Sequence, residues 1–586
     1  MAQTIKVLSH GRTITAEKDE NLADKLHQAG IPINLYCNKR GLCGKCLVEI
    51  VSGRRPEPTD KELTWLGERK LNPDHRLACQ YTIDGDLEIN VPLSSTHEDV
   101  PILPVIPGSA VPPDPAIRKY FLEIAKPKIS SPDSLSEQIL AALGTQRLKM
   151  QPEVLRELSG ALEPAGAGAT IVVHREEEVI AVEPGATLGR NFGLAVDVGT
   201  TTLVMELVDV ESGKTVDLEA ALNSQSARGA DVISRITHAL SGTENAAELR
   251  GLVLESLNQM VRRLLVRNRI SPSSVYEAVV SGNTAMNHLM LGVPVDTLAR
   301  APYHAVFSRL PCLDTADVGL GIHPRGKVYF SPNIKSYVGG DISSGFLASG
   351  LAGRAGCFLF IDLGTNGEIV LKAGEDIMAT STAAGPAFEG MNISCGSPAL
   401  PGAIYRAEDS GVLRVFTIAN SPPRGICGTG LIDLIAVFRA RGEIAAAGAI
   451  QGGTGNLAVA EGLTLTQNDI RQVQLACAAV KSGIRLMLKA AALSAERLDG
   501  IYVAGAFGNY LNIANAQAIG LLPTIAGDKV VFVGNSSLAG ARRLLVAKGE
   551  RDQLESLAAG IRYVSLASDP EFQDQFIRSL EFMAWP

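Results

Sequence analysis

The pattern of apolar and polar positions changes its period several times along the chain. Residues 4–8 and 12–15 alternate between apolar and polar, and residues 21–29 then follow a helical period. Alternation with a period of two is typical of half-buried strands. A further alternating stretch, 86–91, closes this first segment. We therefore expect a strand pair, a helix and a closing strand in that order.

A second patterned segment covers residues 118–190. Its stretches predict a strand, two helices and a strand pair, at 120–124, 134–143, 152–162, 169–174 and 179–182. This order indicates a small α+β domain. His174 stands beside the charged residues 175–178, so we expect it at a solvated hairpin tip.

The longest region carries one pattern twice. An apolar strand that ends in Asp, a Gly-Thr turn and a second strand occupy residues 194–203, and the same order returns without gaps at 359–368. Such repetition indicates a duplicated domain with one hairpin in each half. The expected fold is therefore multidomain α+β and α/β, with a duplicated, two-lobed domain over residues 191–586.

Proline interrupts the pattern between the first two segments. Seven prolines fall between residues 91 and 115, at 92, 101, 104, 107, 112, 113 and 115. Such a density neither pairs into a sheet nor continues a helix, so residues 93–117 are expected to form a semi-rigid linker. An ordered connector packed on a neighbouring lobe is the alternative.

Composition supports a large folded protein and excludes some partners. A chain of 586 residues with 46% hydrophobic residues is too long for one core, so several domains are expected. No apolar run reaches the ~18 residues of a membrane span and no signal peptide is visible, so we expect a cytoplasmic protein. The net charge of -8 gives no attraction to nucleic acid or to a membrane surface.

Four of the nine cysteines gather in the first segment. Cys37, Cys43, Cys46 and Cys79 have the spacing C-x5-C-x2-C followed by a distant fourth cysteine, which is the spacing of a [2Fe-2S] site. A zinc site is the rival, but zinc sites usually pair two close knuckles and only one close pair is present. Residues 1–92, with their β-grasp order of elements, resemble plant and adrenodoxin-type [2Fe-2S] ferredoxins.

The repeated hairpins have the composition of phosphate-binding turns. Gly and Thr at a hairpin tip offer N–H and hydroxyl donors to phosphate oxygens, and an adjacent Asp can hold Mg²⁺ through water. The candidate metal-binding and catalytic carboxylates are Asp197 and Asp362, and the candidate phosphate-binding residues are Gly199, Thr200, Thr201, Thr202, Gly364, Thr365, Asn366 and Gly367. Glu368 either positions an attacking water or is a solvated strand residue.

Other Gly-rich turns are candidates for the same cleft. They lie at 280–286, 338–342 and 427–433, and residues 501–510 add a strand that runs into small residues where a base could stack. Asn283 and Asp341 serve either as nucleotide or metal contacts or as ordinary turn and capping residues. Gly505 and Ala506 are the candidate contacts for adenosine.

The order of two phosphate hairpins and an adenosine motif resembles the acetate and sugar kinase, Hsp70 and actin superfamily. The paired glycines of many members are Gly505 and Ala506 here. The whole layout, a ferredoxin at 1–92, a linker at 93–117, a middle domain at 118–190 and an ATPase at 191–586, resembles the reductive activators of corrinoid-dependent proteins.

That resemblance implies an activity. It implies an ATP-hydrolysing activase that returns an inactive Co(II) corrinoid protein of a methyltransferase system to Co(I), with the [2Fe-2S] cluster, ATP and Mg²⁺ as cofactors. It also implies an upstream electron donor and a homodimer formed through the C-terminal region. The alternatives are an ATP-driven activase for another low-potential metalloenzyme and a small-molecule kinase with a regulatory cluster.

Overall fold

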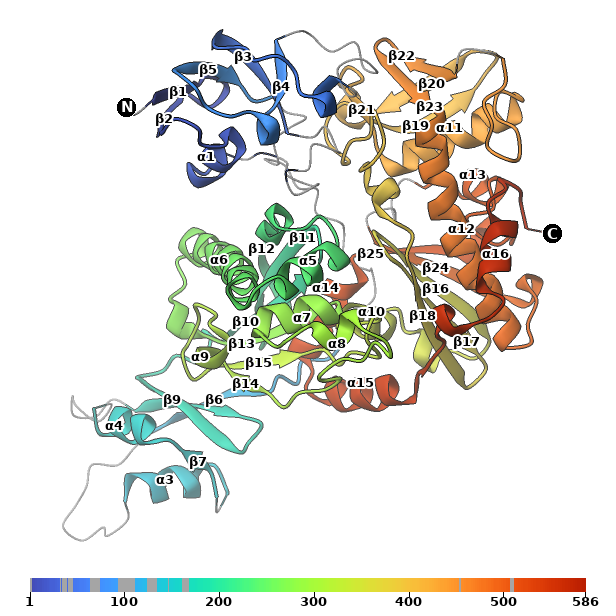
Figure 1. Ribbon diagram of the computed structural model, residues 1–586. Coiled ribbons are helices and arrows are strands. Elements are labelled where there is room, and N and C mark those ends of the chain that lie inside the picture. The colour runs from blue at the N-terminus through green and yellow to red at the C-terminus, as the bar shows by residue number, and fades with distance from the viewer. Residues whose placement is uncertain are drawn as a thin grey trace.

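The N-terminal domain is a five-stranded sheet with helix α1 packed against it (Figure 1). The computed structural model describes residues 3–31, 33, 39, 46–63, 74–92, 111–123, 134–145, 147–160, 168–452, 455–505 and 511–585. The sheet order is β2-β1-β5-β3-β4, with strands Gln3–Val7 (β1), Arg12–Ala16 (β2), Leu47–Gly53 (β3), His75–Leu77 (β4) and Leu87–Asn90 (β5). Helix α1, Leu22–Gln28, begins where the Asn21 side chain accepts the N–H of Asp24. The predicted strand pair, helix and closing strand are all present.

The middle domain is a four-stranded sheet with two helices. Its order is β6-β8-β9-β7, from strands Ile117–Leu122 (β6), Lys149–Met150 (β7), Ala169–His174 (β8) and Glu178–Pro184 (β9). Helices α3, Leu135–Ala142, and α4, Pro152–Gly160, lie between these strands in the chain. A capping box between Ser134 and Glu137 fixes the start of α3.

Buried polar contacts attach the middle domain to the following lobe. Lys327 Nζ lies 2.8 Å from Glu178 Oε2, and the hydroxyl of Tyr276 donates to Glu183. The prediction of a solvated His174 is wrong, because this side of the domain packs against the lobe and leaves His174 only 8% exposed. The sequence of the hairpin alone does not show that the first ATPase lobe packs against it.

The first lobe of the ATPase region is a six-stranded sheet in the order β12-β11-β10-β13-β15-β14. Its strands are Phe192–Val198 (β10), Thr202–Asp209 (β11), Lys214–Leu222 (β12), Val275–Gly282 (β13), Leu313–Asp314 (β14) and Lys327–Phe330 (β15). Strands β10, β11 and β12 are antiparallel, whereas β13 and β15 run parallel to β10. Its helices are Val232–Leu240 (α5), Thr243–Asn268 (α6), Thr284–Leu291 (α7), Asp296–Ala299 (α8), Thr315–Val318 (α9) and Gly340–Ala348 (α10).

The second lobe repeats this topology. Its order is β25-β24-β16-β17-β18-β26, with strands Cys357–Leu363 (β16), Gly367–Ala373 (β17), Asp376–Thr382 (β18), Gly500–Ala504 (β24), Val530–Gly534 (β25) and Arg562–Tyr563 (β26). Strands β16, β17 and β18 are antiparallel, and β24 and β25 run parallel to β16. Five strands of each sheet therefore correspond, and the predicted duplication is present in three dimensions.

The helices of the second lobe are Gly428–Ala440 (α11), Gln467–Ala490 (α12), Ile513–Ala518 (α13), Ser536–Val546 (α14), Gly549–Gly560 (α15) and Phe572–Ser579 (α16). Between β18 and α12 the chain adds two small sheets, β20-β19-β21 and β22-β23 (Figure 1). Their strands are Ala403–Asp409 (β19), Leu413–Thr417 (β20), Gly425–Ile426 (β21), Asn456–Ala460 (β22) and Leu463–Thr466 (β23).

One helix of each lobe packs partly against the sheet of the other lobe. Helix α10 follows the first sheet in sequence, yet its Ile342 and Phe346 pack in a core with Phe360 of the second sheet. Helix α14 follows the second sheet, yet its Leu538 and Leu544 pack in a core with strands of the first. The two helices meet closely, since a Cβ atom added to Gly540 would lie 2.3 Å from the Ser344 carbonyl oxygen. No helix in the described part of the chain is long and apolar enough to cross a bilayer.

Candidate active site

Both hairpin tips open into one cavity of about 430 Å³ between the lobes. Most of the sequence-predicted nucleotide residues line it: Asp197, Gly199, Thr200, Thr201, Thr202, Asn283, Asp341, Asp362, Gly364, Thr365, Asn366, Glu368 and Gly505. Gly367 does not, because it lies in β17 against Thr382 and Val480. Ala506 lies outside the described residues. Segments far apart in sequence thus form one site.

Asp197 stands near the end of the mostly buried strand β10, where it is held by residues of the other half of the molecule. Its carboxylate accepts hydrogen bonds from Asn535 Nδ2 at 2.8 Å and from Ser537 Oγ at 2.7 Å. Burial raises the pKa of Asp197, while these two donors favour its charged form and oppose that shift. The aspartate is therefore oriented before any ligand binds.

The first hairpin turn depends on Gly199 and on a buried arginine. A Cβ atom on Gly199 would lie 2.5 Å from the carbonyl oxygen of Thr202, so a larger residue does not fit. Arg235, fully buried behind the turn, donates from Nη2 to the Thr200 carbonyl and from Nε to the Gly229 carbonyl at 2.9 Å. The backbone of the tip is thus fixed from behind.

The second hairpin carries two facing carboxyl groups. Asp362 and Glu368 are cross-strand partners on β16 and β17. Burial, then the charges of Asp197 and Glu389, raise the pKa of Asp362 to about 7. Burial, then Asp341 and Asp362, raise the pKa of Glu368 well above its usual range. Glu368 lines the enclosed cavity, which disfavours its reading as a solvated strand residue.

The same cavity holds further acidic and amide groups. Burial, then Asp362 and Asp197, raise the pKa of Asp341 to about 8. Asn283 does two tasks at once: its Oδ1 accepts the Met286 N–H at 2.9 Å and caps α7, and its Nδ2 donates to Thr200 Oγ1 at 3.0 Å. The capping and site roles of Asn283 therefore coexist.

The carboxylates create a need for a cation. Like charges this close raise one another's pKa values, and a divalent ion would relieve them. Across the part of the chain that the structure describes, no three His, Cys, Asp or Glu side chains are placed to bind a metal directly. The carboxylates that line the cavity are oxygen donors, which is the type of ligand that Mg²⁺ prefers.

Gly505 supports Asp362 from behind. It has φ +87°, and a Cβ atom there would lie 2.6 Å from Asp362 Oδ1 and 3.0 Å from the Leu363 carbonyl oxygen. Glycine is required at this end of β24 by both the backbone angle and the space. The conformation of the following residues, 506–510, lies outside the described residues.

Several cavity residues have no predicted counterpart. Asn535 and Ser537 follow β25 in the run Val533-Gly-Asn-Ser-Ser537, which parallels Val338-Gly-Gly-Asp341 after β15, so a search for the repeat could have found them. Glu389, in the short 3-10 helix Pro386–Glu389 (η7), has no such signal. Its carboxylate is close to both hairpin tips.

The cavity also has an apolar lining. Phe388, Met391, Leu400 and Ile418 of the second lobe line it together with Leu222 of the first. The predicted turn at 427–433 contributes Cys427, Gly428 and Thr429 to the lining. The cavity thus combines polar groups of the hairpins with apolar side chains.

The N-terminal domain brings together the two described cysteines of the predicted cluster site. Leu47 and Leu77 are paired across β3 and β4, and the N–H of Ala78 donates to the Cys46 carbonyl at 2.8 Å. Cys46 and Cys79 therefore lie on neighbouring segments, and both are buried. Cys37 and Cys43 lie outside the described residues. Cysteines on two adjoining segments fit the four-thiolate ligation of a [2Fe-2S] cluster.

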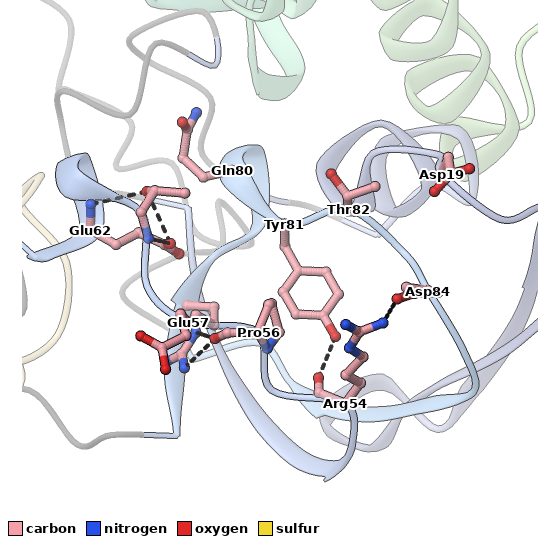
Figure 2. A pocket seen from close by; sticks show the side chains of 11 residues that line it. Asp19, Arg54, Pro56, Glu57, Glu62, Gln80, Tyr81, Thr82 and Asp84 are labelled. Atoms are coloured by element: carbon pink, nitrogen blue, oxygen red, sulfur yellow. Dashed lines mark hydrogen bonds and ion pairs between the residues drawn. The ribbon is translucent and has the colours of Figure 1, made fainter.

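A second cavity lies in the same domain (Figure 2). It measures about 210 Å³, and the Tyr81 hydroxyl donates to the Arg54 carbonyl at 2.6 Å while Arg54 pairs with Asp84. Gln80 also lines it, and its Nε2 lies 3.5 Å from Cys79 Sγ. A donor at this sulfur would tune a cluster held by Cys79.

Comparison with protein families assigns most of the chain. Residues 5–84 match the 2Fe-2S iron-sulfur cluster binding domain. Residues 108–189 match the RACo linker region, residues 192–354 the RACo middle region, and residues 356–585 the C-terminal domain of RACo, the ASKHA domain. The iron-sulfur and ATPase parts of the sequence interpretation are confirmed.

Curated relatives and a solved structure match most of the chain. The corrinoid activation enzyme RamQ of Eubacterium limosum is 30% identical, over 97% of this chain and 97% of the relative. The [Co(II) methylated amine-specific corrinoid protein] reductase of Methanosarcina barkeri is 26% identical, over 67% of this chain and 77% of the relative. A solved reductive activator for corrinoid, iron-sulfur protein is 32% identical with a TM-score of 0.75, and the match covers 99% of this chain and 98% of that one.

Proposed function

The chain belongs to the family of reductive activators of corrinoid proteins, and from this premise we propose that it uses ATP to reduce an inactive Co(II) corrinoid protein to Co(I). The observation that supports this most directly is the union of two parts in one chain: a 2Fe-2S ferredoxin domain and a cleft where two repeated phosphate hairpins meet. A ferredoxin alone transfers electrons downhill without nucleotide. A nucleotide cleft beside it indicates an uphill step.

The residues that line the cleft have separate roles in the ATPase reaction. Thr200, Thr201, Thr202, Thr365 and the hairpin N–H groups bind the phosphates, and the Gly505 region holds adenosine. Asp197 and Asp362 hold Mg²⁺ through water, and Glu368 orients the attacking water. The oriented Asp197 and the pair of facing carboxyl groups on β16 and β17 support these assignments.

Electron delivery uses the N-terminal domain. Cys37, Cys43, Cys46 and Cys79 would hold the [2Fe-2S] cluster, which when bound supplies one electron to Co(II) and is reduced again by an upstream electron donor. Every ~59 mV of shortfall in a one-electron step costs about 1.4 kcal/mol, so nucleotide must favour the state in which Co(I) forms. In a two-lobed fold, closure of the cleft is the conformational change that nucleotide binding can drive. We also infer a homodimer through the C-terminal region.

The direct test is reduction of a corrinoid protein. Chemically reduced protein, mixed with a Co(II) corrinoid protein, should produce the Co(I) absorption band when MgATP is added and not before. Asp197→Ala should abolish the ATP-dependent part and keep the cluster spectrum, whereas Cys79→Ser should lose the cluster spectrum and keep ATP binding.

Three outcomes would count against the proposal. Equal Co(I) formation with and without ATP would show that ATP is not coupled to the reduction of Co(II). ATP-dependent phosphorylation of a small molecule with no redox partner would instead identify a kinase with a regulatory cluster. ATP turnover stimulated only by another low-potential metalloenzyme would identify the chain as an activase for that enzyme instead.

A further inference from the structure

Glu389 joins the two hairpin tips across the cleft. Its Oε2 accepts the hydroxyl of Thr201 at 3.0 Å, and its Oε1 accepts the hydroxyl of Thr365 at 2.7 Å. Thr201 belongs to the first lobe and Thr365 to the second. One carboxylate therefore bridges the two lobes at the place where the hairpins face one another.

The bridge occupies groups that a nucleotide needs. A threonine hydroxyl has one proton to donate, so each of these two hydroxyls serves either Glu389 or a phosphate oxygen. A carboxylate also resembles a phosphate, because both are anionic acceptors with oxygens that can be bonded from two sides. Glu389 and a bound polyphosphate thus compete for the same donors, in a cavity that already holds Asp197 and Asp362.

The surrounding backbone allows Glu389 to leave. It is the last residue of η7, which is bounded by Gly385 with φ +76° and Gly390 with φ +78°. Both glycines adopt a conformation open to few other residues, so rotation at these two points can swing the short helix. Beyond them Ser394 is fixed, with its N–H bonded to Asp469 Oδ1 at 2.6 Å.

A movement of Glu389 would also displace other residues that line the cleft. A Cβ atom on Gly390 would lie 2.6 Å from the carbonyl oxygen of Ser397, so the two segments touch. Ser397, Pro398 and Leu400 also line the cavity. A shift of η7 would therefore alter this part of the cavity wall.

We propose that Glu389 is a carboxylate latch that holds the phosphate-binding hairpins together in the nucleotide-free protein and is displaced when polyphosphate enters. The proposal rests on the proposed nucleotide function of the cleft and adds how entry is controlled. It makes Glu389 a positioning residue whose removal strengthens nucleotide binding, which is the opposite of what loss of an ordinary ligand contact does.

The test compares nucleotide affinity in full-length variants by calorimetry, with a non-hydrolysable ATP analogue and Mg²⁺. Glu389→Gln removes the competing charge, and Glu389→Asp shortens the side chain so that it cannot span both hydroxyls. Both should lower Kd, by roughly tenfold for Glu389→Gln, as expected when a charge-assisted hydrogen bond no longer competes. Glu461→Gln, in an exposed turn of the same lobe, is the matched control and should leave Kd unchanged.

The outcomes separate the latch from the proposed function. If the unmodified protein fails to bind the analogue, the nucleotide assignment fails. If it binds and both Glu389 variants bind equally well or more weakly, the latch is wrong and the nucleotide assignment stands. Amide hydrogen exchange at 385–391 gives an independent readout, because the analogue should raise exchange there in the unmodified protein; unchanged or slower exchange would overturn the latch.

Discussion

Arg235 is a buried cation whose only task in the described structure is to shape the first hairpin. Three of its nitrogens donate to Thr200, Gly229 and Gln225, and burial lowers its pKa despite the opposing charges of Asp231 and Glu389. A guanidinium can serve several acceptors in one plane, whereas an ammonium is a point donor.

Lysine at this position should therefore damage the nucleotide site without touching the nucleotide. We expect Arg235→Lys to reduce kcat/KM for ATP by tenfold or more and to lower the free energy of unfolding by about 1–3 kcal/mol, since buried carbonyls lose their donors. ATPase kinetics and urea denaturation measure the two effects. An unchanged kcat/KM in a destabilised variant would show that Arg235 only supports the fold.

At the scale of elements, the crossing of α10 and α14 controls how closely the lobes approach. Gly540 faces the backbone of Ser344, with no room for a methyl group. Alanine in the middle of a helix normally stabilises it by up to about 1 kcal/mol relative to glycine. In Gly540→Ala, the steric clash of the added methyl group with Ser344 should outweigh this stabilisation.

Two glycine substitutions test this point together. Gly540→Ala should lower the melting temperature and weaken nucleotide binding, because the helices must separate. Gly251→Ala, in the interior of α6 where an added Cβ meets nothing within 4 Å, should be neutral or stabilising. If Gly540→Ala is as stable as Gly251→Ala and binds nucleotide normally, the crossing does not set the approach of the lobes.

Sequence patterns predicted the site residues that belong to contiguous motifs. They missed the residues that only folding brings into the site. Asp197 and Asp362 could be identified because strand, aspartate and Gly-Thr turn are contiguous. The donors to Asp197 could not, since Asn535 lies 338 positions away and its partner is fixed only by the packing of α14 against the first sheet. Glu389 was missed for the same reason, because a lone glutamate after a strand carries no signal of the two hydroxyls it meets.

The whole molecule depends on the junction between the middle domain and the first lobe. His323 lies there, 8% exposed, with its ring centroid 5.0 Å from that of Tyr276. Burial, then Arg325, lower its pKa to about 4, against the charges of Glu157 and Glu183 that favour protonation; Lys119 also lowers it. The junction therefore contains a neutral histidine at physiological pH.

Acid should weaken this junction. Between pH 6.5 and about 4 the unfolded chain binds a proton at His323 that the folded chain does not, so stability falls as pH falls, by at most about 1.4 kcal/mol per pH unit for one proton. In His323→Gln that proton is absent, and the slope of unfolding free energy against pH should be shallower by up to this amount. Denaturation curves at several pH values measure it, and equal slopes would exclude His323 as the titrating group.

The repeated lobes and their crossing helices have a consequence for the symmetry of the molecule. Two copies of one unit that each pack a helix against the sheet of the other are arranged as a domain-swapped pair would be, joined here by a covalent connection. A pair of identical chains would place the same partners around the two equivalent aspartates. In this single chain the partners differ, since Asp197 is held by an asparagine and a serine whereas Asp362 faces a glutamate.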